Sequence, residues 1–178
     1  MKLDLDQSTA LLLRTPRVLR ELLAGLADAW TTPDYGPGTW SAKEIVAHYI
    51  FGERTDWVPR LRIILEHGEA RRFEPFDRSG HKELLARHTL AELLDLFERE
   101  RAEGLAALRA AGLTHGDLAR AGTHPALGRV TLANLLAAWV VHDLNHIAQI
   151  AKALAYQYKA EVGPWEAYLS ILAPPNPR

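Results

Sequence analysis

The spacing of apolar residues is the feature that most constrains the fold of this 178-residue chain. Four long stretches repeat apolar side chains every three or four residues, as an amphipathic helix does. No stretch alternates apolar and polar residues over the length of a strand, and no repeat recurs at a period of roughly 20 to 50 residues. The pattern therefore predicts an all-α fold.

The first of these helices is predicted over residues 5–26. Pro16 falls early in this stretch, where a proline predicts either a kink or a late start of the helix. The following segment, TTPDYGPGT (31–39), holds two prolines and two glycines and cannot continue a helix. We expect a loop there.

The second helix is predicted to begin at Ala42, because Ser41 and Glu44 have the spacing of a capping box. Its apolar residues continue to Leu65, and Pro59 is expected to kink it. A helix that is apolar around most of its circumference is buried on more than one side. It must lie centrally in the fold or against a second chain.

Two more helices follow a polar loop predicted over residues 66–80. Thr89 and Glu92 form a second capping-box pattern, and Gly112 is expected to end the helix that they start. The fourth helix is predicted over residues 132–156. Four helices joined by loops of this length predict a four-helix bundle, followed by a short C-terminal segment.

Length and charge limit the classes of protein to consider. We expect one domain over residues 1–178, a size that can bury a substantial core. The chain carries 21 Lys plus Arg and 22 Asp plus Glu, so no net positive field attracts nucleic acid or anionic lipid. We therefore expect neither partner.

The chain has no cysteine, which excludes disulfides, thiolate ligands and a cysteine nucleophile. A metal, if bound, must be held by nitrogen and oxygen atoms. The N-terminal sequence lacks the features of a signal peptide, and no stretch approaches the roughly 18 apolar residues of a membrane span. We expect a cytoplasmic protein.

The predicted fourth helix carries the most informative pattern. Six of its residues trace one continuous stripe: Leu135, Trp139, His142, His146, Gln149 and Ala153. His142 and His146 differ by about 40° around a helix and by ~6 Å along it, so both imidazoles can reach one ion. Two histidines on a core-facing stripe need partners for their ring nitrogens.

His48 is the third candidate, because it stands alone in the apolar run from Ile45 to Phe51. A lone buried histidine is usually hydrogen-bonded within the core, and an isolated HxxxH pair also occurs by chance. Together, His48, His142 and His146 form a three-nitrogen set if the second and fourth helices are neighbours. Such a set leaves coordination positions open, as catalytic metal sites do.

The other polar residues near these histidines have simpler explanations. Solvent exposure explains four histidines near loops and helix ends: His67, His81, His88 and His115. His124 precedes the fourth helix, in a loop that could fold over one end of the bundle. Gln149 lines a pocket or is a buried amide bonded to backbone, and Trp139 is a core residue or a substrate platform.

No carboxylate can be assigned as a general base from the sequence. Four lie near the histidines along the chain: Glu44, Glu53, Asp56 and Asp143. Glu44 is engaged in capping by the prediction above, and Glu53 lies about 140° around the helix from His48. Asp143 lies about 100° from His142, so its side chain could face solvent.

Two long segments resemble the DinB/YfiT-like superfamily, small bacterial four-helix-bundle proteins many of which are described as metal-dependent hydrolases. They are GTWSAKEIVAHYIFGE (38–53) and HPALGRVTLANLLAAWVVHDLNHIAQI (124–150), and VGPWEAYL near the end matches more loosely. The metal ligands of that family fall on His48, His142 and His146. The identity of the third ligand, His48, rests on this resemblance.

The resemblance implies a zinc or nickel ion, a homodimer and a small-molecule substrate, in some branches a low-molecular-weight thiol. It makes the chain a candidate metal-dependent hydrolase or thiol S-transferase, and a non-catalytic metal-binding stress-response protein is the alternative. A DNA-binding role is disfavoured by the near-zero charge. The sequence also lacks a Rossmann glycine motif, a P-loop and a GxSxG elbow.

Overall fold

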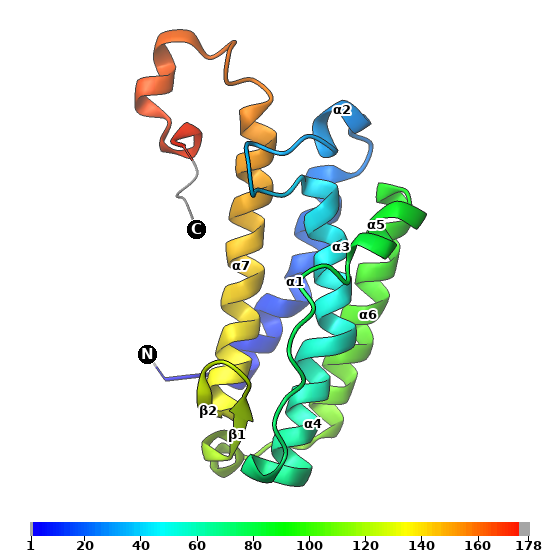
Figure 1. The fold of residues 1–178 in the computed structure, drawn as a ribbon, viewed down its shortest axis with the longest axis vertical. Coiled ribbons are helices and arrows are strands. Elements are labelled where there is room, and N and C mark those ends of the chain that lie inside the picture. Colours follow the sequence, from blue (N-terminus) through cyan, green and yellow to red (C-terminus); the bar gives the residue numbers. More distant parts are fainter. Residues whose placement is uncertain (1, 175–178) are drawn as a thin grey trace.

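Four long helical rods form a bundle in the computed structural model, which describes residues 2–174 (Figure 1). The rods are α1 (Leu5–Leu23), α3 (Ala42–Gly52) continued by α4 (Val58–His67), α6 (Leu90–Ala110) and α7 (Leu132–Tyr156). Two short helices, α2 (Asp28–Thr31) and α5 (Lys82–Arg87), and 3₁₀ turns at Gly68–Ala70, His115–Ala119, Gly163–Tyr168 and Ser170–Leu172 lie between or after them. The all-α four-helix bundle predicted from the sequence is confirmed.

The order of the helices requires one long return connection. Figure 1 shows α1 and α7 running in one direction, while α3, α4 and α6 run in the other. The chain between α4 and α5 therefore travels back along the bundle beside α3. We call residues 71–81, the part of this connection that follows the turn at Gly68–Ala70, the crossover. It brings residues that are remote in sequence next to α3.

Local signals set the helix ends as predicted. The Ser41 hydroxyl accepts a hydrogen bond from the Glu44 amide at 3.1 Å, and α3 begins at Ala42. Thr89 and Glu92 make a complete capping box at the start of α6. Gly112 follows the end of that helix with a φ of 57°, a conformation that glycine adopts without strain.

The second predicted helix is interrupted just before Pro59. Residues Glu53–Trp57 form a π-helical turn, and α4 resumes at Val58. Proline lacks an amide hydrogen, and its ring clashes with the carbonyl four residues earlier in a regular helix. Widening the turn before Pro59 relieves both problems. The irregularity predicted at Pro59 is a π turn on its N-terminal side.

The sequence prediction missed a small hairpin between α6 and α7. Strand β1 (Ala121–His124) pairs antiparallel with β2 (Gly128–Thr131). Each strand has four residues, which is too short for alternation to stand out in a sequence. A parallel bridge between Arg72 and Thr123 attaches the start of the crossover to this hairpin.

A polar layer divides the apolar core into two clusters. Each of the four rods contributes one residue to this layer: Thr15, Glu53, Arg101 and Asp143. Along α6, for example, Arg101 falls between Phe97 of one cluster and Leu105 of the other.

Helix α3 is covered within a single chain. It packs against α5, α6 and α7, and its residues Ile45 to Ile50 are all buried. Its apolar circumference therefore does not require a second chain, which removes the reason first given for a homodimer. No helix within residues 2–174 combines the length and hydrophobicity needed to cross a membrane.

Candidate metal centre

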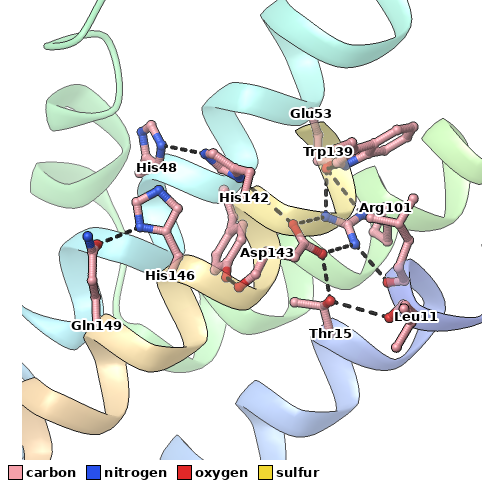
Figure 2. A network of polar contacts seen from close by, with 12 residues as sticks. Leu11, Thr15, His48, Glu53, Arg101, Trp139, His142, Asp143, His146 and Gln149 are labelled. Carbon is pink, nitrogen blue, oxygen red and sulfur yellow. Dashed lines mark hydrogen bonds and ion pairs between the residues drawn. The ribbon is translucent and has the colours of Figure 1, made fainter. Parts of the chain in front are cut away.

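Three histidines from two neighbouring helices converge at one point. His48 comes from α3, and His142 and His146 come from successive turns of α7 (Figure 2). One ring nitrogen of each lies within 4.8 Å of the others, and the Nε2 atoms of His48 and His142 are 3.0 Å apart. The expected proximity of the second and fourth helices is confirmed, and the three predicted residues come together.

Gln149 fixes the orientation of His146. The Nδ1 atom of His146 lies 2.7 Å from the Gln149 side-chain oxygen, which accepts a hydrogen bond only if Nδ1 carries the proton. Figure 2 shows the other ring nitrogen of His146 directed toward His48. That tautomer presents a lone pair at Nε2, as a metal ligand must. Of the two roles considered for Gln149, the structure supports the first, because the residue lines the pocket beside the histidines.

The electrostatic environment keeps His48 neutral. Its side chain is buried, and this burial, with smaller contributions from His146 and His142, lowers the pKa of His48 to about 2. A neutral imidazole is the form that binds a metal ion. The Nδ1 atoms of His48 and His142 are buried without a hydrogen-bond partner in the described chain, so both rings are held by packing.

Asp143 lies behind His142 and is not solvent-facing, which differs from the orientation considered above. Its side chain is 3% exposed, and its carboxylate is 3.9 Å from His142 Nδ1. Arg101 and Thr15 each donate a hydrogen bond of 2.6 Å to Asp143 Oδ2. These bonds and the nearby charges lower the pKa of Asp143 against the effect of burial. At 3.9 Å the carboxylate makes no hydrogen bond to the His142 ring, but it places a negative charge directly behind it.

A cleft opens beside the three histidines. Its volume is about 1150 Å³, and among the residues that line it are Trp40, Asp56, Phe76, Arg78, Gln149 and Lys152. The Trp40 ring lies 4.7 Å from the His48 ring and stacks on His146 at 5.9 Å. The space exceeds what an ion and a few water molecules need and is sufficient for a small organic molecule.

The π turn directs Asp56 and Glu53 to different environments. In a regular helix Asp56 would lie about 80° around the axis from His48, and a π turn reduces that angle because each residue advances less. Asp56 accordingly lines the cleft, where it pairs with Arg60 at 2.5 Å. Burial raises the pKa of Asp56, and Arg60 partly opposes this effect. Glu53 instead belongs to the buried polar layer with Arg101.

The structure also decides the predictions made for four other residues. Trp139 is a core residue, 1% exposed, whose indole donates to Glu53. His124 packs against Phe73 and does not line the cleft. His81, predicted to be exposed, is wholly buried, and its Nε2 atom lies 3.1 Å from the Glu44 carboxylate. Glu44 thus pairs with His81, and no reciprocal bond to the Ser41 amide forms.

Comparison with known proteins agrees with the four-helix-bundle fold. The model of the DinB superfamily matches residues 11–150. Among solved structures, the chain is similar to YfiT from Bacillus subtilis, described as a probable metal-dependent hydrolase with an unusual four-helix bundle topology. The TM-score is 0.70 at 23% identity, over 83% of this chain and 84% of that one, which is a likeness of fold. A search of curated proteins found no match.

Proposed function

This chain belongs to the DinB superfamily, and on that premise we propose that it is a metal-dependent hydrolase that holds one divalent ion on His48, His142 and His146. The observation that carries the proposal is the approach of three imidazole nitrogens to within 4.8 Å of one another beside a cleft. His146 has its tautomer set by Gln149, and His48 is neutral. The donor set fits a metal that accepts nitrogen ligands, and we propose zinc or nickel.

A bound ion of this type would polarise a substrate oxygen and lower the pKa of water at neutral pH. The protein supplies binding, orientation and proton transfer. Trp40 packs on His48 and His146 and shields one side of the centre from solvent. Asp56 is the carboxylate that lines the cleft within residues 2–174, so we assign it the role of accepting a proton there.

Thiol S-transfer is the second candidate activity, and the absence of cysteine from the chain is consistent with it. A thiol nucleophile in this cleft would have to come from a low-molecular-weight cosubstrate, because the chain offers none. A purely structural or sensory metal is less well supported. Within residues 2–174, no fourth histidine or carboxylate joins the three-histidine group to close the coordination shell.

Metal analysis tests the proposal directly. Protein purified without nickel resin is expected to contain one divalent ion per chain, and each of His48→Ala, His142→Ala and His146→Ala is expected to lose it. Asp56→Asn and His115→Ala serve as controls that keep the ion, since neither residue belongs to the group. Stoichiometric metal in a His142→Ala/His146→Ala double variant would disprove the assignment.

A cobalt-substituted sample separates the two candidate activities. Direct binding of a small thiol to cobalt gives an intense sulfur-to-metal charge-transfer band, which water and carboxylate ligands do not produce. Appearance of this band on adding a low-molecular-weight thiol favours S-transfer. An unchanged spectrum leaves hydrolysis as the proposed reaction.

We also propose a homodimer. The support is exposed aromatic surface on the C-terminal segment, where Trp165 is 70% and Tyr168 is 86% exposed. Sedimentation analysis at micromolar concentrations measures the mass, and a monomer throughout that range would contradict the proposal.

A further inference from the structure

Two cations on the cleft wall have no neutralising carboxylate within residues 2–174. Arg78 is exposed and makes no ion pair within residues 2–174. Lys152 donates a hydrogen bond of 2.7 Å to the backbone carbonyl of Ala173, which is a neutral acceptor. Asp56, the acid on this wall, is already paired with Arg60. The cleft therefore carries excess positive charge that can attract an anion.

Lys152 lies farther along α7 than the two histidines of that helix. Lys152 and His146 both belong to α7. Lys152 follows His146 by six residues, or ~9 Å along the helix axis. Gln149 lies between them and also lines the cleft. The Lys152 ammonium lies 5.5 Å from the ring of Tyr35, which restricts where the side chain can lie. A ligand that reaches both Lys152 and the histidines must therefore be elongated.

The surface near the histidines is aromatic. Trp40 stacks on His146, and Phe76 meets the His48 ring edge-on at a centroid distance of 5.6 Å. Tyr35 lines the cleft near Lys152. Flat apolar groups pack favourably against such rings. The ligand that fits this surface therefore has an apolar or planar body.

The crossover holds Phe76 and Arg78 in place from both ends. At its start, Phe73 is 2% exposed and its amide donates to the Thr123 carbonyl at 3.0 Å. At its end, buried His81 pairs with Glu44 of α3. Two fixed ends limit the movement of the residues between them, so Phe76 and Arg78 are part of a built cleft wall.

We propose that this cleft selects a small substrate with a flat apolar body and an oxyanion, either carboxylate or phosphate, which the positive charge of Lys152 and Arg78 attracts. Because Lys152 and His146 are separated by ~9 Å along the axis of α7, the anion and the part of the substrate that reaches the histidines occupy different positions along the cleft. This inference rests on the proposed function, in that it names the substrate class of the same site. It assigns selectivity to residues outside the metal-binding group.

Calorimetry with simple probes and metal-free full-length protein tests the charge selection, since without the metal an anion cannot bind to it. The probes are phenylbutyrate, phenylpropyl phosphate and the neutral phenylbutyramide. We expect one or both anions to bind about tenfold more tightly than the amide, because charge-assisted hydrogen bonds are stronger than neutral ones. The stronger of the two anions identifies the oxyanion.

Variants then test which residues cause the preference for anions over the neutral amide. Arg78→Gln and Lys152→Gln are each expected to weaken anion binding several-fold and to leave amide binding unchanged, and the double variant is expected to abolish the preference. Arg71→Gln is the matched control, an exposed arginine of the crossover that does not line the cleft. Equal binding of anion and amide, no binding of any probe at millimolar concentration, or an equal loss in Arg71→Gln would overturn the inference.

Metal content of the same variants separates this inference from the proposed function. Arg78→Gln and Lys152→Gln are expected to retain one divalent ion per chain. If the ion depends on the three histidines while the probes show no charge selection, the substrate class is wrong and the metal site stands. If the wild-type chain holds no ion, the proposed function fails whatever the probes show.

Discussion

Arg101 of α6 donates to both carboxylate oxygens of Asp143 of α7, at 2.6 Å from Nη1 and 3.0 Å from Nη2 (Figure 2). The same guanidinium donates to Glu53 at 2.8 Å and to the Leu12 carbonyl at 2.7 Å. Burial disfavours its charge, but the two carboxylates outweigh this effect and hold the pKa of Arg101 above its ordinary value. This network joins four helical segments, and one of its members adjoins His142.

Replacing Arg101 with methionine is expected to destabilise the protein severely. The change leaves the carboxylates of Glu53 and Asp143 buried without their cation, and breaking a buried ion pair in this way costs about 3–5 kcal/mol. Urea unfolding measures the loss. Arg20 is the matched control, because it also bridges two acids, Asp95 and Glu98, but at the surface. Arg20→Met is expected to cost less than about 1 kcal/mol. Similar losses in the two variants would contradict the prediction.

Acid is expected to destabilise the metal-free protein through His48. Below pH ~6.5 the unfolded chain takes up a proton at this residue, whereas the folded chain resists protonation because burial lowers the pKa of His48 to about 2. The free energy of unfolding therefore falls with decreasing pH by about 1.4 kcal/mol per unit from this residue alone. Urea unfolding at several pH values compares wild type with His48→Gln, which should show a shallower fall. Parallel curves would rule out this role for His48.

A methyl group at Gly122 of β1 is expected to clash. The added Cβ would lie 2.8 Å from Ile64 and 2.9 Å from the Phe73 ring, both of which are buried. Overpacking of this kind costs about 1–3 kcal/mol, so Gly122→Ala should lower the urea midpoint. Gly116→Ala, where the added Cβ would lie 3.6 Å from Thr114 Oγ1, is the control and should stay within about 0.5 kcal/mol of wild type. Equal midpoints for the two variants would contradict the close packing.

Loss of His81 is expected to loosen the crossover. His81→Ala removes the buried partner of Glu44 and the ring that packs against Trp40. We expect a loss of about 1–3 kcal/mol and faster proteolysis within residues 71–81. His67→Ala removes an exposed histidine and should change neither measurement. Unchanged proteolysis in His81→Ala would show that the crossover is held by other contacts.

The features that the sequence predicted correctly are local ones. A capping box such as that of Thr89 and Glu92 lies within one helical turn, so the residues that specify the start of α6 are adjacent in sequence. The approach of His142 to His146 likewise follows from helix geometry alone. Placing His48 beside them required the arrangement of α3 and α7, for which the family resemblance was needed.

The features that were missed depend on contacts between distant segments. Arg101, Glu53 and Asp143 each have the character of surface residues when considered singly, and only the assembled bundle shows that they neutralise one another. Phe76 lies in a polar stretch that predicts a loop, and His81, which directly follows that stretch, was predicted to be exposed. The return of the chain along α3 nevertheless places both residues beside His48. No local pattern encodes that return path.

His48 and His142 are 94 residues apart, so the ribosome completes α3 well before it completes α7. A nascent chain that has completed α3 but not α7 offers an ion one of its three nitrogens, and a single imidazole holds zinc or nickel weakly. At the proposed metal site, tight binding of an ion would therefore require that α7 has left the ribosome and docked against α3. Metal uptake by newly made protein would thus report completed assembly of the bundle, and the ion would then stabilise the finished fold by mass action.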